Sequence, residues 1–479
     1  MNERKKILVD ITYGMSFRNI VLNKRFWDFL TKEYDVDLVT PLNFKTSDLK
    51  DLGISNIINV SNNSLGFVRR KILSLNYKAL HIKRLMDLSD FFLKQHHAWP
   101  LVSRFHQSMQ DNDKMTIDLF FWPAIKRTFA GKHIKNLANF FPLFHPLDSI
   151  LKKKKYEFLI NTHSSEYASV LNSQVANNRN LPVICFPMGL DNIMHGPILF
   201  KPAKILFWGE DQEYEFNKFH KNWIEGFSEI QQGMLGSLIF DTLEDTKESI
   251  NINSFYGLKD TDKFLLFCTM PEVNHPGQIE ICEEIILFLD LRKYKHKLII
   301  RLRPGIDEPM WENFKAKHPG RVILQSPSGG SFDKSSLRKD MDIRVEIEDI
   351  SIYASTIKSS SIVISRALST SYTDALFLGT PAVIPQYYPL NINRTVGFRD
   401  MWEQICTVYP HHRKGYNFAF DNHAFVKYLE SVLNNKNKII KEITPGQDYL
   451  IKKQLHNSQK TAGERAIAEI QSFVSSISK

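Results

Sequence analysis

Short apolar runs alternate with amphipathic stretches through much of the first half of the chain. The first run is followed by a Gly-containing turn and a helical pattern near 18–32. The runs expected to be strands are 6–10, 36–40, 157–161, 182–186 and 204–208. Short apolar runs separated by helical patterns are typical of parallel strands joined by crossover helices. The pattern therefore predicts an α/β fold built from βαβ units.

The same alternation starts again after a polar break at 242–258. The expected strands of the second half are 263–268, 297–302, 321–324, 361–365 and 381–384, with helices at 277–292, 351–359 and 370–378. A chain of 479 residues is too long for one ordinary hydrophobic core. We predict two Rossmann-like domains facing a cleft, at 1–245 and 255–445. A C-terminal helix at 446–479 is a candidate to pack back on the first domain.

Residues 62–155 depart from this pattern, because they are basic and aromatic and show no strand alternation. We interpret them as a helical insertion in the first domain. The segment 119–144 interleaves aromatic residues with four cationic ones, Lys126, Arg127, Lys132 and Lys135. Such a segment either lies in a membrane interface near a lipid-linked acceptor or is a core helix with a solvated basic face.

Composition narrows the class of protein. Hydrophobic residues make up 43% of the sequence and charged residues 24%, which is a globular balance. The four cysteines show no Cys-x-x-Cys spacing, which argues against a zinc site or a disulfide framework. The N-terminus is expected to be a strand rather than a signal peptide, and no run of about 18 apolar residues is present. We expect a cytoplasmic protein.

The net charge of +10 favours anionic partners. The sequence has neither zinc-finger spacing nor an aromatic RNA-binding motif, so nucleic acid is not an expected partner. We attribute the charge to phosphate ligands and to an anionic membrane surface. The second attribution would place the protein peripherally at the inner face of the cell membrane.

Ligands of doubly wound folds bind beyond the carboxyl ends of the strands, so the loops after the strands carry the candidate residues. After 6–10, Gly14 permits a tight turn, Ser16 can cap the next helix and Arg18 adds charge. The start of a helix offers free N–H groups and the positive end of a dipole, which suit an anion. The alternative is an ordinary structural turn.

Four candidates for acid–base chemistry follow strands of the first domain: Asp10, His163, Glu166 and Asp191. The pKa of an ordinary histidine suits proton transfer, whereas a strand-end aspartate often caps the following turn instead. Asp-x-Asp pairs occur at 35/37, 111/113 and 340/342, and none of these lies in a convincing strand-end loop. We interpret them as surface acids and expect no metal.

In the second domain, Arg301 and Arg303 lie at the end of the run 297–302 and point to one side if the strand continues. Arginine makes bidentate contacts with phosphate or carboxylate groups. Thr269, which follows the run 263–268, joins them as a candidate ligand-binding residue. The alternative is a pair of edge arginines in surface salt bridges.

Polar residues also follow the run 361–365 of the second domain. Arg366 comes first, and then Ser369, Thr370 and Ser371 precede a helix that contains Asp374. Three hydroxyl groups at a helix start suit a phosphate, with backbone N–H groups doing most of the binding. An ordinary N-cap, which needs only one hydroxyl, is the alternative.

These residues resemble the donor domain of GT-B glycosyltransferases, and CDP-glycerol polymerases and sugar 2-epimerase-like enzymes are similar there. The shared pattern is an acidic residue, a helix, a strand, Ser-Thr, an acid-Ala pair and Gly-x-Pro. The matching residues here are Glu346 or Asp349, the helix 351–359, Ser369 and Thr370, Asp374 and Ala375, and Gly379 to Pro381.

A second stretch resembles a family of bacterial surface-carbohydrate glycosyltransferases. The matching residues are Asp191, Asn192, Gly196, Trp208, Gly209, Glu210, Gly236, Phe240 and Asp241. The sequence departs from the family at Leu190, where Trp is usual, and at His195, where Lys is frequent. The two resemblances cover roughly residues 180–390.

The resemblance implies a GT-B glycosyltransferase of capsule or lipopolysaccharide biosynthesis. Its donor would be a nucleotide sugar, which is a substrate rather than a cofactor, and its acceptor a glycan or a lipid-linked glycan. Catalysis would need no metal. Two alternatives stay open: a transferase of polyol phosphate from a CDP-linked donor, and a non-catalytic sugar- or nucleotide-binding subunit of a polysaccharide assembly complex.

Overall fold

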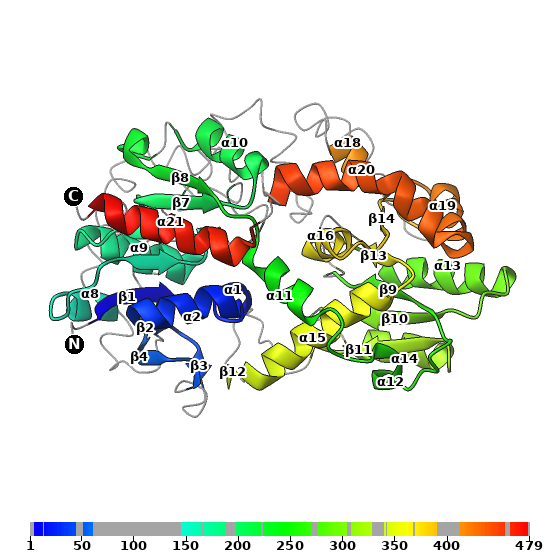
Figure 1. Cartoon of the computed structure of the whole chain (residues 1–479). Coiled ribbons are helices and arrows are strands. Elements are labelled where there is room, and N and C mark those ends of the chain that lie inside the picture. The colour runs from blue at the N-terminus through cyan, green and yellow to red at the C-terminus, as the bar shows by residue number, and fades with distance from the viewer. Residues whose placement is uncertain are drawn as a thin grey trace, which may run out of the picture. The chain divides into compact units, whose positions relative to one another are not determined.

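The computed structural model describes both halves of the chain but little of the predicted insertion, of which only 145–155 is included. The described residues are 4–12, 14–44, 51–60, 145–164, 166–187, 189, 193, 198–221, 224–270, 272, 275–303, 308–327, 340–341, 343–366, 369–389, 412–455 and 460–477. The chain divides into two compact units (Figure 1). Unit 1 comprises Met1–Leu238, Leu337–Asp342 and Ser458–Lys479, and unit 2 comprises Ile239–Ser336 and Ile343–Asn457.

Unit 1 is built on a parallel sheet of 7 strands in the order β4-β2-β1-β5-β6-β7-β8. The strands are β1 (Lys5–Asp10), β2 (Tyr34–Thr40), β4 (Ile54–Asn59), β5 (Leu159–Asn161), β6 (Val183–Cys185), β7 (Lys204–Phe207) and β8 (Gln231–Met234). A separate two-stranded sheet pairs β3 (Asn43–Phe44) with β12 (Asp340–Met341). Three consecutive residues of β1, Ile7 to Val9, are fully buried. Continuous burial is expected of a parallel strand, because helices cover both faces of its sheet.

The helices of unit 1 are α1 (Gly14–Ile20), α2 (Lys24–Glu33), α8 (Pro146–Leu151), α9 (Tyr167–Asn178), α10 (Glu210–Phe219) and α21 (Ala462–Ile477), with a 3-10 turn η5 (Phe227–Glu229). The single helix predicted near 18–32 was wrong, since α1 and α2 occupy this stretch. Asn23 separates them because its Oδ1 accepts the backbone N–H of Phe26 at 3.0 Å and so caps α2.

The C-terminal helix α21 packs within unit 1. Its Phe473 meets Phe158 edge to face, with 6.3 Å between the ring centroids. Its Glu469 pairs with Lys204 of β7 at 2.6 Å. Because the Lys204 side chain is only 4% exposed, this ion pair ties α21 to a buried strand.

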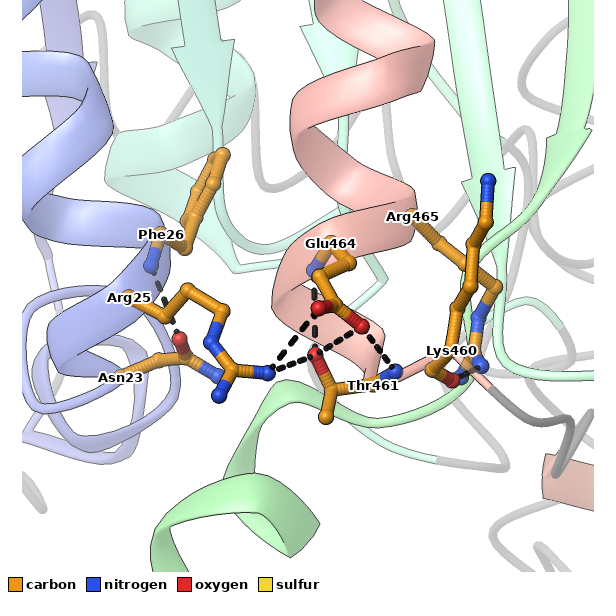
Figure 2. Close-up of polar contacts among 7 residues, drawn as sticks. All are labelled: Asn23, Arg25, Phe26, Lys460, Thr461, Glu464 and Arg465. Atoms are coloured by element: carbon orange, nitrogen blue, oxygen red, sulfur yellow. Dashed lines mark hydrogen bonds and ion pairs between the residues drawn. The ribbon is translucent and has the colours of Figure 1, made fainter.

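The first turn of α21 is held beside α2, as Figure 2 shows. Thr461 and Glu464 form a capping box, in which the Thr461 N–H donates to the Glu464 carboxylate at 2.8 Å. Arg25 of α2 donates to Thr461 Oγ1 at 2.8 Å and pairs with Glu464 at 3.5 Å. Arg465 donates through Nε to the carbonyl of Leu235 at 2.6 Å. These contacts fix the last helix both to α2, near the start of the chain, and to Leu235, near the end of the first segment of unit 1.

Unit 2 is built on a parallel sheet of 6 strands in the order β11-β10-β9-β13-β14-β15. The strands are β9 (Phe264–Cys268), β10 (Lys297–Arg301), β11 (Val322–Gln325), β13 (Val363–Ser365), β14 (Ala382–Pro385) and β15 (Phe418–Ala419). The first five lie where the apolar runs predicted them. The two-residue β15 was not predicted, because so short a strand leaves no pattern.

The helices of unit 2 are α12 (Ile252–Phe255), α13 (Gln278–Leu291), α14 (Glu308–Lys317), α15 (Ile343–Ser359), α16 (Thr370–Phe377), α18 (His412–Gly415), α19 (Asn422–Asn434) and α20 (Lys436–Leu455), and α11 (Leu238–Thr246) begins at the unit boundary. Three predictions need correction. The polar break at 242–258 contains the end of α11 and all of α12, and the helix 351–359 is the second half of α15. The stretch 446–479 is not one helix, because α20 ends at Leu455 in unit 2 and α21 begins in unit 1.

Both sheets reverse their strand order at one place, between β1 and β5 in unit 1 and between β9 and β13 in unit 2. In doubly wound folds, ligands bind beyond the carboxyl ends of the strands at such a switch point. The two switch points are therefore the places to examine for a site. Among the described residues, no helix is both long enough and apolar enough to cross a membrane.

Candidate functional site

The switch point of unit 1 is centred on Asp10, the last residue of β1. Its side chain is fully buried, and it accepts hydrogen bonds from Ser169 Oγ and, at 2.8 Å, from Asn172 Nδ2, both on α9. Burial raises the pKa of Asp10 to about 7, although these two hydrogen bonds oppose the rise. Its backbone carbonyl accepts from Thr162 Oγ1 at 2.6 Å. Asp10 therefore joins β1, β5 and α9, and a ligand has no access to its carboxyl group.

His163 and Glu166, two further predicted site residues, form the turn between β5 and α9. Glu166 caps α9, since its Oε2 accepts the Ser169 N–H at 2.9 Å. The Glu166 N–H donates to His163 Nδ1, also at 2.9 Å. An imidazole that accepts through Nδ1 carries its proton on Nε2 when it is neutral. In this conformation the ring can therefore donate a hydrogen bond through Nε2, but it cannot accept a proton there.

Gly14, Ser16 and Arg18 all lie in α1. Gly14 and Ser16 are buried, and Arg18 is half-buried. Gly14 is the first residue of the helix, so Ser16 lies inside the first turn rather than at the predicted capping position. Asp191 lies outside the described residues, together with Asn192 and Gly196 of its motif.

Of the three Asp-x-Asp pairs named above, the pair whose side chains are both described lies in β2. Asp37 accepts a hydrogen bond from Tyr156 Oη at 2.6 Å and lies 3.6 Å from Lys154. Asp35 pairs with Arg4 at 3.4 Å. Asp37 is buried, so the prediction of a surface acid was wrong for this residue. Both carboxylates are engaged by protein groups, and no metal-ligand cluster is found among the described residues.

Beside the switch point of unit 2, at the end of β10, lies a largely buried arginine that has one terminal nitrogen without a partner among the described residues. Arg301 is the last residue of β10, and its side chain is 10% exposed. Its Nη2 donates to both carboxylate oxygens of Asp349 on α15, at 3.0 and 2.9 Å. Its guanidinium lies 4.6 Å from the ring centroid of Tyr353, one turn further along α15. The Nη1 atom is buried and has no hydrogen-bond partner among the residues that the structure describes.

The start of α16 lies at the same edge of the sheet, directly after β13. Ser369 is its N-cap residue, but its side chain makes no capping hydrogen bond. Instead Ser369 Oγ shares a hydrogen bond of 2.7 Å with Ser365 Oγ, at the end of β13. The first N–H groups of α16 therefore receive no side-chain cap from Ser369, which leaves them suited to an anion.

Side chains of α15 and α16 connect this helix start to Arg301. Tyr353 Oη donates to Asp374 of α16 at 2.8 Å, and burial raises the pKa of Asp374 to about 7. Ser371 hydrogen-bonds with Cys268, the last residue of β9, whose pKa is raised by burial to about 11. The ends of three neighbouring strands and the first turns of α16 thus form one connected cluster.

Arg303 and Thr269 lie beside this cluster. The expectation that Arg301 and Arg303 share a strand face was wrong, because β10 ends at Arg301 and Arg303 is exposed beyond it. Thr269 Oγ1 accepts the Arg303 N–H at 2.8 Å. Thr269 therefore holds the backbone of the loop that follows β10, at Arg303.

Arg366 and Glu346 are both buried in unit 2. The Arg366 guanidinium donates to the backbone carbonyls of Pro385, of Tyr387 at 2.6 Å and of Pro276 at 3.3 Å. Burial lowers its pKa to about 10. These contacts give Arg366 the role of holding three loops at the carboxyl edge of the sheet. Glu346 lies on α15, one turn before Asp349.

Sequence reasoning missed His275 and Tyr353. His275 lies in the loop after β9, and its pKa is lowered to about 4 by burial and by the nearby charges of Arg366 and Arg303. It is therefore a neutral hydrogen-bonding group in a positively charged region. The sequence could have indicated His275, because it follows the first predicted strand of the second domain. Tyr353 follows Asp349 by four residues, so the helical period could have paired them.

No family model matches the sequence, and no curated protein matches it. Solved structures do match the fold. A protein described as a UDP-N-acetylglucosamine 2-epimerase from Listeria monocytogenes is 10% identical, with a TM-score of 0.53 over 98% of this chain and 97% of that one. MnaA of S. aureus, solved with UDP, is 10% identical, with a TM-score of 0.54 over 99% and 98%.

The N-terminal domain of trehalose-6-phosphate phosphatase from Candida albicans is 12% identical, with a TM-score of 0.50 over 99% of this chain and 98% of that one. At such low identities these likenesses show the fold alone. Together with the two parallel sheets of 7 and 6 strands, they show that the chain has a two-domain Rossmann-like α/β fold of the GT-B type.

Proposed function

We propose that this protein is a glycosyltransferase that binds a nucleotide sugar in unit 2 and transfers the sugar to a glycan or lipid-linked acceptor. One observation carries the proposal. Arg301 is largely buried beside the switch point of unit 2, and among the described residues its Nη1 has no partner. The start of α16, at the same ends of the strands, lacks a side-chain cap from its N-cap residue. A buried cation and backbone N–H groups at one sheet edge are the partners that a diphosphate requires.

The surroundings of Arg301 suit it to a departing diphosphate. Asp349 and the Tyr353 ring hold its guanidinium in place, so little reorganisation is needed when negative charge develops on the leaving group. Arg303, exposed beside it, adds a second positive charge. We propose that these groups take the place of a metal ion.

The base that accepts the proton of the acceptor hydroxyl is proposed to be Asp191. Asp10 is unsuited to this role, because its carboxyl group is buried and accepts two internal hydrogen bonds. His163 is unsuited in the conformation described, because its Nδ1 already accepts the Glu166 N–H. Glu166 is engaged in capping α9 through Oε2. Asp191 is the remaining candidate, and it lies in the motif that resembles surface-carbohydrate glycosyltransferases.

The same motif supports a role in bacterial surface polysaccharide biosynthesis, with the protein acting in the cytoplasm near a lipid-linked acceptor. Trp208 ends the β7 segment of this motif, and its Nε1 donates to the carbonyl of Pro187 at 2.8 Å. Gly236, further along the motif, adopts a left-handed backbone with φ of 81°. Glycine adopts this conformation without strain, which explains its presence just before the unit boundary.

A second candidate function is epimerisation of a UDP-sugar. It is favoured by the fold likeness to the Listeria protein described as a UDP-N-acetylglucosamine 2-epimerase and to the S. aureus protein solved with UDP. Both functions would use the same diphosphate site. They differ in product, because an epimerase changes the sugar without an acceptor and a transferase needs one.

A donor panel separates these functions. The purified protein is incubated with UDP-, GDP- and CDP-linked donors, with and without a lipid-linked glycan fraction, and products are resolved by mass spectrometry. Nucleoside diphosphate released only with acceptor supports sugar transfer, and CMP from a CDP-linked polyol supports phosphotransfer. An isomerised nucleotide sugar without acceptor supports the epimerase. Binding without turnover of any donor contradicts an enzymatic role.

A further inference from the structure

Unit 2 has a second group of cations, at the amino ends of its strands, whereas Arg301 lies at the carboxyl end of β10. A cavity there is lined by Lys259, Asp262, Asp290, Lys293, Tyr294, Lys295, Lys297 and Arg321. Lys297 begins β10 and Arg321 immediately precedes β11, so the cavity lies at the amino ends of these strands. The length of β10 separates it from Arg301 by about 13 Å.

The charge of the cavity is not balanced by its own residues. Five cationic side chains face two acidic ones. Asp290 is paired with Arg321, and Asp262 accepts the backbone N–H of Lys259 at 3.0 Å. Within the part of the chain that the structure describes, the ammonium groups of Lys259, Lys293 and Lys295 have neither an ion pair nor a hydrogen bond.

Further cations lie near the cavity and contribute, after burial, to two pKa shifts. The pKa of His296 is lowered to about 4 by burial and by the charges of Lys263 and Arg321. The pKa of Lys436 is lowered by burial and by the charges of Lys358 and Lys263. Cations therefore extend along the amino edge of the sheet beyond the cavity.

The backbone of Lys293 adds an observation of a different kind. Its φ is 57°, in the left-handed region, where a helix usually ends on glycine. Lys293 follows the C-cap of α13, and the Tyr294 N–H beside it donates to the Leu289 carbonyl at 2.8 Å. A lysine is thus kept in a strained conformation in the wall of a cationic cavity. The same backbone conformation ends α9 at Asn180, with φ of 55°, so it belongs to the helix end and places the Lys293 side chain at the wall of the cavity.

We propose that this cavity binds a phosphate-bearing anion, at a site separate from the proposed donor site. Several ammonium groups and one guanidinium converge on a recess, and their charges exceed those of the acids beside them. Phosphate groups match this set because they are negatively charged and their oxygens accept several hydrogen bonds. The phosphate belongs either to a soluble anion or to a lipid headgroup.

The test uses the full chain carrying Arg301→Ala, which weakens the proposed donor site. Lys293→Gly and Lys295→Gln are added together, and Lys32→Gln with Lys221→Gln in unit 1 forms the control, which removes the same charge from exposed positions outside the cavity. Lys293→Gly also relieves the left-handed strain, so the cavity variant should melt no lower than its parent. Inorganic pyrophosphate is titrated by calorimetry, and sedimentation is measured with phosphatidylcholine vesicles with and without phosphatidylglycerol.

The cavity variant should bind pyrophosphate at least about 10-fold more weakly than its parent, while the control variant should not change. That result assigns the site to a soluble anion. If the parent instead binds only the phosphatidylglycerol vesicles, and the cavity variant loses this binding, the site takes lipid headgroups. Equal losses in the cavity and control variants, or no binding of either probe to the parent, would overturn the proposal.

Discussion

The two sheets have the same kind of switch point, but the polar groups near them differ in how fully they are hydrogen-bonded. In unit 1, the carboxyl group of Asp10 is covered by Ser169 and Asn172, and the neighbouring Thr12 Oγ1 and Ser169 Oγ lie 2.9 Å apart. In unit 2, Arg301 uses only one terminal nitrogen on Asp349, and within the described part of the chain the other terminal nitrogen has no partner. A polar group that is already satisfied holds strands and helices together, whereas an incompletely satisfied one can bind a ligand.

The difference shows that a residue's place at a switch point does not decide its role. Asp10 and Arg301 both end a central strand beyond which ligands are expected. What separates them is how far the neighbouring helix satisfies each charge. A buried group costs free energy unless it is paired, so an unpaired nitrogen on a buried arginine points to a missing partner.

The largest expected effect tests whether the general base is Asp191 rather than a residue near Asp10. Asp191→Asn should reduce transfer by about 10²–10⁴-fold, the range for loss of a general base, while folding and donor binding are unchanged. Initial rates with a saturating donor measure it. His163→Ala is the matched comparison, and full activity of Asp191→Asn alongside a crippled His163→Ala would move the base to His163.

The next prediction tests whether the incompletely bonded Arg301 of unit 2 binds a diphosphate. Arg301→Ala should weaken nucleoside diphosphate binding by about 10- to 150-fold, because one charge-assisted hydrogen bond is lost, with little change for the free nucleoside. Calorimetry with both ligands measures the contrast. Arg292→Ala is the control, since Arg292 is an exposed arginine of the same unit that pairs with Glu430 at 3.2 Å. Equal weakening of both ligands would mean that the phosphates bind elsewhere.

A third prediction tests whether the fully hydrogen-bonded Asp10 of unit 1 stabilises the fold. Asp10→Ala should lower the free energy of unfolding by about 1–3 kcal/mol, because it leaves the buried Ser169 and Asn172 side chains without their acceptor. Denaturant unfolding measures this change. The matched variant Asp10→Asn keeps a polar group in place and should lose less stability. An Asp10→Ala variant as stable as the wild type would mean that the network contributes nothing to the fold.

The same aspartate should make stability depend on pH. Its pKa in the folded protein, about 7, is above its ordinary value, so the folded state binds the proton more tightly. The contribution of Asp10 to stability is therefore full below about pH 4 and is lost as the pH rises towards 7. The difference in unfolding free energy between wild type and Asp10→Asn should change across this window. A constant difference would mean that Asp10 does not titrate there.

The smallest expected effect concerns metal. If arginines stabilise the leaving diphosphate, EDTA should leave the transfer rate unchanged, and added Mg²⁺ or Mn²⁺ should not raise it. The rate is measured in chelated buffer with and without each ion. Complete loss on chelation, restored by either ion, would remove the proposed role of Arg301 as a substitute for metal.

The sequence predicted the fold class better than the state of the polar residues. Apolar runs such as 263–268 and 297–302 marked buried parallel strands, because continuous burial leaves a continuous apolar pattern. The capping Asn23 that divides α1 from α2 was visible in the sequence but was outweighed by the helical period on either side. Short strands such as β15 leave too few residues for any pattern.

The site was harder to predict, for a different physical reason. The sequence indicated Arg301, Ser369 and Asp374 through their positions after strands, but not which of them was already paired. Pairing depends on residues far away in the chain, such as Asp349 for Arg301 and Tyr353 for Asp374. Arg366 shows the limit most clearly, because its three carbonyl partners lie in two other loops.

The position of α21 has a consequence for synthesis on the ribosome. Phe473 and Glu469 supply contacts to Phe158 and Lys204, which are made more than 250 residues earlier in the chain. Domains generally fold as units as they emerge, with the N-terminal one first. Here the N-terminal unit emerges without the helix that completes its core and must wait while all of unit 2 is translated. During that interval the surface that α21 covers in the folded unit has no cover.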